Sequence, residues 1–240
     1  MTSPPLVLFH GFTGTTASFD GVLEHLPGRH ALRPALLGHG ARAPGVVDFE
    51  GEVDRLAALM PPVPAHLAGY SLGARLALGL ALRHPRLVAR LTLIGVNPGL
   101  AEETERIARR RADAGLCEML ETQGLAAFVT AWETQPLFAT QSTLDAARRE
   151  RRHAMRLAQD PSELARSLRT TGLSEMPDYW PRLPRLSLPL TLMAGELDTK
   201  FAAIAQSAHA RVPNSRLVIA PGAGHDLLLE RPDLVAVELR

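Results

Sequence analysis

The sequence predicts an α/β protein built on a mostly parallel, doubly wound sheet with a helical insertion, and three observations support this prediction. Short apolar segments alternate with segments of helical spacing over most of the chain, which is typical of parallel sheets covered by helices on both faces. The stretch 97–186 interrupts this alternation and holds no strand-like segment. The 240 residues are 46% apolar and 21% charged, so the chain is long enough to bury a core without a disulfide bond or a metal.

The part of the chain before residue 97 is expected to supply four strands with helices between them. The strands are short apolar runs, which suit strands buried on both faces, and they cover Leu6–Gly11, His30–Gly40, Ala65–Tyr70 and Arg90–Val96. Helices are expected over 18–26, Phe49–Met60 and Leu72–His84. A proline directly follows each of the last two helices, and proline cannot continue a helix.

The rest of the chain is expected to hold a helical cap and two further strands. Residues 97–186 are rich in Arg, Glu, Ala and Leu at helical spacing, which indicates an insertion that covers one end of the sheet. The segments Leu188–Asp198 and Ser215–His225 predict the last two strands, each followed by a helix. The expected organisation is therefore a core over 1–96 and 187–240 with a cap over 97–186.

Charge and composition exclude several classes of protein. The net charge of +1 gives no indication of a nucleic-acid partner, and the one cysteine excludes an internal disulfide bond and a cysteine-rich metal cluster. The amino terminus has no basic signal-peptide region, and no apolar run is long enough to span a bilayer. We expect a soluble cytoplasmic protein without membrane insertion. Lys200 is the only lysine among 26 basic residues, so a carboxylate site would be built from guanidinium groups.

The segment Gly69-Tyr70-Ser71-Leu72-Gly73 joins an expected strand to an expected helix. This is the pattern of a nucleophile elbow, in which a serine at the tip of a strained turn is exposed at the carboxyl ends of the strands. The two glycines are needed because a Cβ at either position would clash with the neighbouring strand or helix. The alternative is a glycine-rich turn with an incidental serine.

A base and an acid for the serine follow in the expected places. Asp198 lies just after one of the last two strands and His225 just after the other, so both are expected at the same edge of the sheet as Ser71. Glu196, two residues before Asp198, is the rival acid, and we expect it in the strand end or its turn. An incidental His225 would be a surface-loop histidine.

An oxyanion hole is expected where the first strand ends. The segment "HGFTG" at residues 10–14 follows that strand, and the backbone N–H groups of Phe12 and Leu72 are the natural donor pair. The side chains of His10 and of His39 in "GHG" are expected to support these loops rather than to perform chemistry.

These motifs resemble the α/β-hydrolases, and more narrowly the 2-succinyl-6-hydroxy-2,4-cyclohexadiene-1-carboxylate synthases (MenH) of menaquinone biosynthesis, over nearly the whole chain. The segments "LFHGFTG" and "GHG" and the order Ser, Asp, His are general to the fold. The more specific segments are "GYSLGAR", "NPGL", "RRRAD", "FVTAWETQPLF", "PDYWPRL" and "GELDTKF". The resemblance implies an α/β-hydrolase fold with a helical cap.

The resemblance also implies a lyase. Members of that family remove a proton from 2-succinyl-5-enolpyruvyl-6-hydroxy-3-cyclohexene-1-carboxylate and expel pyruvate. On this interpretation Ser71, deprotonated by His225, acts as the base, Asp198 orients His225, and the oxyanion hole holds the enolate oxygen. No metal or organic cofactor is implied, and the partner is a small polycarboxylate substrate.

The residues implied to bind this substrate lie in the elbow and in the cap. They are Tyr70, Arg75, Arg109, Trp132 and Arg156, with Arg152 as the rival of Arg156. Each cap arginine has the alternative of a solvated helix face. Two other functions stay open: a carboxylesterase that uses Ser71 as a covalent nucleophile, and a binding protein without catalytic activity.

Overall fold

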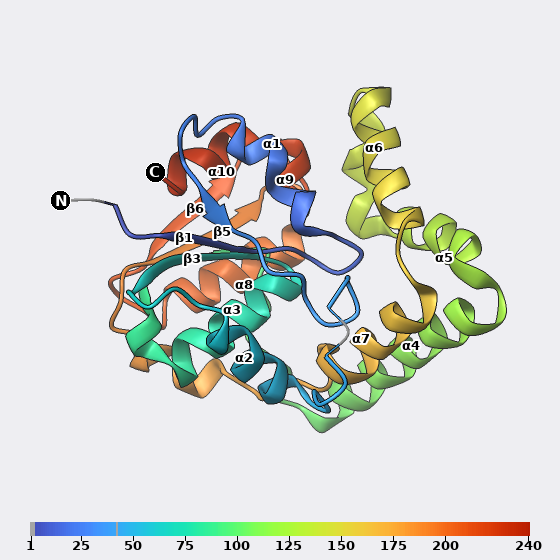
Figure 1. Ribbon diagram of the computed structural model, residues 1–240, viewed down its shortest axis with the longest axis horizontal. Coiled ribbons are helices and arrows are strands. Elements are labelled where there is room, and N and C mark those ends of the chain that lie inside the picture. The colour runs from blue at the N-terminus through green and yellow to red at the C-terminus, as the bar shows by residue number, and fades with distance from the viewer. Residues whose placement is uncertain (1–2, 42) are drawn as a thin grey trace.

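The computed structural model describes residues 3–41 and 43–240, and its centre is one parallel sheet of six strands (Figure 1). In spatial order the strands are β2 (Ala31–Leu32), β1 (Leu6–Phe9), β3 (Ala65–Tyr70), β4 (Val88–Ile94), β5 (Leu190–Gly195) and β6 (Arg216–Ala220). Every neighbouring pair is parallel, so the carboxyl ends of all six strands lie at the same edge. The predicted fold class is confirmed.

Two elements near the amino terminus differ from their predicted extents. The strand predicted over His30–Gly40 is reduced to Ala31–Leu32, because Pro34 has no N–H for a ladder and the chain turns away after it. The helix predicted over 18–26 is a 3₁₀ turn, η1 (Thr16–Phe19), followed by one turn of α-helix, α1 (Asp20–Leu23). Thr15 caps η1 with its side chain and so sets where this pair begins.

Helices cover both faces of the sheet, as a doubly wound fold requires (Figure 1). One face carries α2 (Phe49–Ala58), α3 (Leu72–Arg83) and α8 (Thr199–His209). The other carries α1 together with α9 (Leu227–Glu230) and α10 (Pro232–Glu238). A short 3₁₀ turn, η2 (Pro85–Leu87), leads from α3 into β4.

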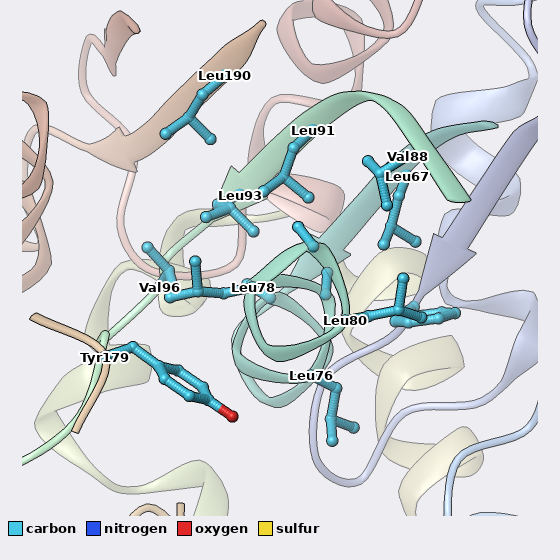
Figure 2. Close-up of a cluster of buried hydrophobic side chains, with 14 of the residues drawn as sticks. Leu67, Leu76, Leu78, Leu80, Val88, Leu91, Leu93, Val96, Tyr179 and Leu190 are labelled. Carbon is cyan, nitrogen blue, oxygen red and sulfur yellow. The ribbon is translucent and has the colours of Figure 1, made fainter. Parts of the chain in front are cut away.

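The main core lies between the central strands and α3 (Figure 2). Leu76, Leu78 and Leu80 of α3 are fully buried, as are the strand residues Leu67 and Leu91. At the middle of α3, a Cβ added to Gly79 would lie 3.0 Å from the Tyr179 hydroxyl and from a Val53 methyl group, so a glycine permits this close packing. The helix that begins at the elbow is therefore held rigidly on the sheet.

The helices between β4 and β5 form the cap, at the right of Figure 1. They are α4 (Glu103–Thr122), α5 (Gly124–Glu133), η3 (Pro136–Thr143), α6 (Ala146–Leu157) and α7 (Pro161–Thr171), and η4 (Trp180–Arg185) leads back to the sheet. A small apolar cluster joins α4, α5 and α7 through Leu120, Phe128 and Leu164. No helix in the described parts of the chain has the length and apolar character needed to cross a bilayer.

Candidate active site

Ser71 lies at the tip of a strained turn between β3 and α3. Its backbone has φ 52° and ψ −109°, a conformation that costs a non-glycine residue about 1–3 kcal/mol. A Cβ on Gly69 would lie 2.3 Å from the Gly73 carbonyl oxygen, and one on Gly73 would lie 2.2 Å from the Phe9 carbonyl oxygen. Strand, turn and helix thus approach so closely that only glycine fits at both flanking positions, and the serine side chain is left at the strand ends.

The structure brings Ser71, His225 and Asp198 into one hydrogen-bonded line. The Ser71 Oγ is 3.2 Å from Nε2 of His225, and Nδ1–H of His225 donates to Oδ2 of Asp198 at 2.7 Å. His225 and Asp198 are both buried. Gly95 gives the imidazole its room, because a Cβ there would lie 2.9 Å from Cε1 of the ring. This arrangement leaves the Nε2 lone pair free to accept the serine proton.

The rival acid Glu196 lies elsewhere. Its side chain is exposed and accepts a hydrogen bond from the backbone N–H of Gly222 at 2.8 Å. The carboxylate of Asp198, by contrast, also accepts from the Phe201 N–H at 3.3 Å, which caps α8 and fixes the carboxylate toward the imidazole. Of the two carboxylates, only that of Asp198 contacts His225.

The predicted oxyanion donors, Phe12 and Leu72, both border the cavity that holds Ser71. Leu72 is the first residue of α3, where a helix leaves its N–H groups without intrahelical partners. Phe12 belongs to the loop after β1, whose next residue, Thr13, has φ 61°. The Thr13 N–H donates to Nε2 of His39 at 3.0 Å, which holds this unusual conformation.

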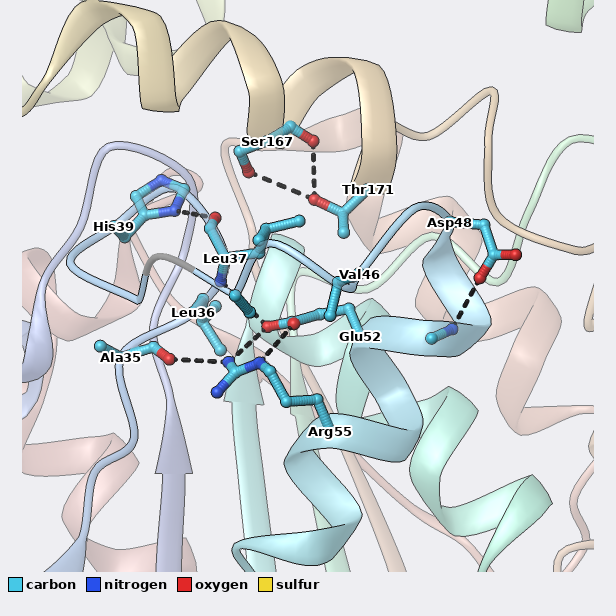
Figure 3. A network of polar contacts seen from close by, with 12 residues as sticks. Ala35, Leu36, Leu37, His39, Val46, Asp48, Glu52, Arg55, Ser167 and Thr171 are labelled. Carbon is cyan, nitrogen blue, oxygen red and sulfur yellow. Dashed lines mark hydrogen bonds and ion pairs between the residues drawn. The ribbon is translucent and has the colours of Figure 1, made fainter.

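His39 belongs to a second loop, which a largely buried polar network joins to α2 (Figure 3). Nδ1–H of His39 donates to the Leu37 carbonyl at 2.9 Å, and the Leu37 N–H donates to the fully buried carboxylate of Glu52 at 2.9 Å. Arg55 donates to the same carboxylate at 2.7 Å and to the Ala35 carbonyl at 2.9 Å. The loop 35–41 is thereby fixed on α2, and through His39 it supports the loop after β1 that holds Phe12 and Thr13.

Three buried histidines predict a loss of stability in mild acid. Burial lowers the pKa of His10 to about 4, that of His39 to about 3 and that of His66 to about 4. In the unfolded chain a histidine titrates near 6.5, so below that pH the unfolded state binds protons that the folded state excludes. The stabilisation is complete above about pH 6.5, and between pH 6.5 and 5 each histidine lowers the free energy of unfolding by about 1.4 kcal/mol per pH unit.

Urea denaturation at pH 7.5, 6 and 5 measures this slope. His66→Gln is expected to reduce the pH dependence of the free energy of unfolding by about a third, because one of the three histidines is removed. Glutamine retains a partner for the Thr92 hydroxyl, which lies 2.9 Å from the imidazole. A free energy of unfolding that is flat over this range would contradict the prediction.

A cavity of about 600 Å³ opens above Ser71 between the core and the cap. Four of the five predicted substrate-binding residues line it: Tyr70, Arg75, Arg109 and Trp132. Arg75 lies on α3 and donates to the Thr171 carbonyl of α7 at 2.8 Å. Burial and the nearby Arg109 lower its pKa to about 9. Arg109 is held by Asp113, which accepts from its Nε at 2.9 and 3.0 Å. Two neighbouring guanidinium groups in a partly apolar cavity favour an anionic ligand.

The fifth predicted residue, Arg156, does not border this cavity. It lies on a neighbouring cavity of about 660 Å³, where its Nη1 donates to Glu133 at 2.7 Å and its guanidinium lies 5.2 Å from the centre of the Phe138 ring. Phe138 borders both cavities and separates Arg156 from the space above Ser71. Its rival Arg152 does not reach that space either and pairs with Asp226 at 2.6 Å.

Lys200 and Asn97 also border the cavity above Ser71, and the sequence did not indicate either as a site residue. For Lys200 a signal was present: it is the only lysine of the chain, and it stands two residues after Asp198 in the first turn of α8. Because α8 begins directly after Asp198, its first residues lie near the same strand ends. Asn97 follows β4 and accepts from the Gly99 N–H at 3.0 Å, a turn that local spacing did not indicate.

Comparison with known proteins shows which family and which relatives this chain resembles. The family described as "alpha/beta hydrolase fold" matches residues 4–232. A 2-succinyl-6-hydroxy-2,4-cyclohexadiene-1-carboxylate synthase of Enterobacter sp. (strain 638) is 35% identical over 97% of this chain and 89% of its own length. A Bacillus subtilis (strain 168) protein, provisionally given the same name, is 36% identical over 97% of this chain and 87% of its own.

Solved structures show the same likeness. MenH from S. aureus superposes with a TM-score of 0.94 at 28% identity, covering 100% of this chain and 93% of that chain. A thermophilic esterase from Thermogutta terrifontis, in a malate-bound form, superposes with a TM-score of 0.85 at 25% identity, covering 100% and 89%. Synthase and esterase thus share this fold, and the residues of the cavity have to discriminate between them.

Proposed function

The chain belongs to the α/β-hydrolase family and, within it, to the family of the 2-succinyl-6-hydroxy-2,4-cyclohexadiene-1-carboxylate synthases; on this premise we propose that it is the lyase that converts 2-succinyl-5-enolpyruvyl-6-hydroxy-3-cyclohexene-1-carboxylate to that product and pyruvate. The observation that supports it most directly is the pair of guanidinium groups, Arg75 and Arg109, in the same cavity as the serine. A substrate with several carboxylates needs fixed cations, and a neutral ester does not.

In the proposed reaction the triad moves protons and the protein forms no covalent intermediate. Nε2 of His225 takes the Ser71 hydroxyl proton, and the serine oxygen removes the proton α to the succinyl carbonyl of the substrate. The N–H groups of Phe12 and Leu72 stabilise the enolate oxygen that develops. As the carbonyl re-forms, the ring C–O bond to the enolpyruvyl group breaks. The departing enolate gains the proton held by the His225 imidazolium and becomes pyruvate, which leaves Ser71 and His225 in their starting states. Asp198 keeps Nδ1 of His225 protonated and stabilises the imidazolium.

The alternative is a carboxylesterase, which the likeness to the Thermogutta terrifontis esterase keeps open. The same serine would then attack an ester carbonyl and form an acyl-enzyme. Pyruvate release from the enolpyruvyl substrate, followed with a coupled lactate dehydrogenase assay, separates the two functions. Brisk hydrolysis of 4-nitrophenyl acetate without any pyruvate release would establish the esterase in place of the lyase.

Alanine at Arg75 or Arg109 is expected to reduce pyruvate release by about 10- to 150-fold. A charge-assisted hydrogen bond is worth about 1.5–3 kcal/mol, and 1.4 kcal/mol corresponds to tenfold. Arg75 is expected to be the more severe, because it lies on the rigid helix α3 and Arg109 lies on the cap. The measurement is kcat/KM for pyruvate release and, in parallel, for 4-nitrophenyl acetate, which has no carboxylate to bind.

A matched control is Arg110→Ala. Arg110 is the next residue of α4, but it is exposed and pairs with Glu175 at 3.0 Å outside the catalytic cavity. Its replacement should leave both activities unchanged. Equal losses on the neutral ester for Arg75→Ala or Arg109→Ala would show that these arginines support the fold and not carboxylate binding.

A further inference from the structure

Helix α6 is attached to the protein by charged groups and not by an apolar face. Its sequence is "AARRERRHAMRL", and its buried residues are Arg152 and Arg156, which are 8% and 3% exposed. Each of the two guanidinium groups pairs with a carboxylate of another element. Arg156 pairs with Glu133 of α5 at 2.7 Å, within the cap, whereas Arg152 crosses to the core and pairs with Asp226 at 2.6 Å. In Figure 1, α6 lies next to α5 at the upper right, across from α1 and α9 of the core.

Asp226 is the residue that directly follows His225. It is 1% exposed, and Arg152 approaches its Oδ2, while Oδ1 has no hydrogen-bond partner among the residues that the structure describes. Although Asp226 precedes α9, its side chain does not cap that helix. A carboxylate buried in this way requires a counter-charge, and the cap supplies it.

The charges of the pair act on Tyr70, which neighbours Ser71 in the chain and His225 in space. The ring of Tyr70, the residue before Ser71, is 5.5 Å from the imidazole of His225. Burial raises the pKa of Tyr70, and the charge of Asp226 raises it further while that of Arg152 opposes this effect. Both charges therefore contribute to the electrostatic potential around Tyr70, whose ring neighbours His225.

We propose that Arg152 and Asp226 are a pair of positioning residues for His225, in which the cap cancels the negative charge that the sequence places beside the imidazole. The inference rests on the proposed function insofar as His225 is the base. With α6 in place the pair is neutral and adds no net charge beside the imidazole that faces the Ser71 hydroxyl. With the Arg152 charge withdrawn, the carboxylate of Asp226 favours the imidazolium, which cannot act as a base.

Other charged groups face His225 from the neighbouring elements, and they stay constant in the test. Asp198 accepts from its Nδ1, and Glu230 of α9 accepts from the Gly224 N–H at 2.6 Å. Lys200 of α8 borders the same cavity, and Arg156 lies behind Phe138, whose ring is 6.4 Å from the imidazole. Substitutions confined to Arg152 and Asp226 therefore isolate the contribution of that pair.

The test is the pH dependence of pyruvate release in two single variants and their combination. Asp226→Asn leaves the Arg152 charge uncompensated, and the acidic limb of the kcat/KM profile is expected to move down by about half to one pH unit. Arg152→Leu leaves the Asp226 charge uncompensated, and the same limb is expected to move up by a similar amount. The double variant Arg152→Leu/Asp226→Asn is neutral again, and its limb is expected within about 0.2 pH units of the wild-type position.

Opposite shifts that cancel in the double variant cannot arise from a general loss of packing. Arg151→Leu is the matched control, because Arg151 is the adjacent, exposed arginine of α6. Its profile should coincide with that of the wild type. Shifts of both single variants in the same direction, no shift in either, or a shift that persists in the double variant would overturn the proposal.

Failure of the proposed function gives a different result. A wild-type protein that releases no pyruvate refutes the lyase, and the same four variants are then profiled on 4-nitrophenyl acetate, since an esterase would use His225 as the same base. If one single variant does not fold, as thermal unfolding by circular dichroism would reveal, the neutral double variant and the remaining single variant still decide the sign of the shift.

Discussion

Replacing Ser71 with alanine is expected to abolish pyruvate release while the fold stays intact. Ser71→Ala removes only the side-chain hydroxyl, whose oxygen lies 3.2 Å from Nε2 of His225. Without it the proposed base is lost, and residual catalysis from binding and the oxyanion hole remains, so a loss of about 10⁴-fold or more is expected. The φ of 52° and the glycine contacts of the turn are unaffected, because alanine has the same Cβ.

Two measurements accompany this variant. Thermal unfolding should occur within about 2 °C of the wild-type temperature, since the hydroxyl of one partly exposed serine contributes little to packing. Ser207→Ala, at an exposed serine of α8, controls for the substitution itself and should retain full activity. Near-normal pyruvate release by a folded Ser71→Ala protein would refute the proposed mechanism, for the lyase and for the esterase alike.

Replacing Asp198 with asparagine is expected to reduce kcat/KM by about 10⁴-fold, as the corresponding change does in serine proteases. The carboxylate accepts Nδ1–H of His225 at 2.7 Å and so keeps the Nε2 lone pair directed at Ser71. An amide in this place can donate to Nδ1, which stabilises the wrong tautomer and leaves the imidazolium without a counter-charge. The Phe201 N–H retains an acceptor, so the cap of α8 and the fold should survive.

Glu196→Gln provides the matched control for the acid. Glu196 is two residues away, carries the same charge, and contacts the Gly222 N–H at the surface. Its replacement should change kcat/KM by less than about twofold, within the usual range for a surface substitution. A severe Glu196→Gln variant beside a mild Asp198→Asn variant would show that the assignment of the acid is wrong.

Some features followed from the sequence because they depend on local patterns. Continuous apolar runs predicted the positions of five of the six strands. β3 matched Ala65–Tyr70 at both ends, whereas β6 ends at Ala220, five residues before its predicted end. The elbow was recognisable because its geometry requires glycine at two fixed positions around the serine. Ser71, Asp198 and His225 follow β3, β5 and β6, and this placed them at one edge, since parallel strands end at the same edge. Their hydrogen bonds of 3.2 and 2.7 Å follow from that placement.

Other features depend on which segments meet, and the tertiary structure alone decided them. Helix α6 buries two arginines and leaves its apolar residues Ala146, Ala147, Ala154 and Leu157 exposed, so the usual inference that the apolar side of a helix is buried fails here. Arg152 and Arg156 are buried because Asp226 and Glu133, remote in the sequence, present carboxylates to them. Likewise, Pro34 shortened β2. The loop after it is fixed by Glu52, a charged residue of a surface helix for which burial is unexpected. Local patterns determine where strands and catalytic turns form, whereas a buried charge is determined by its partner, and the partner is known only once the chain has folded.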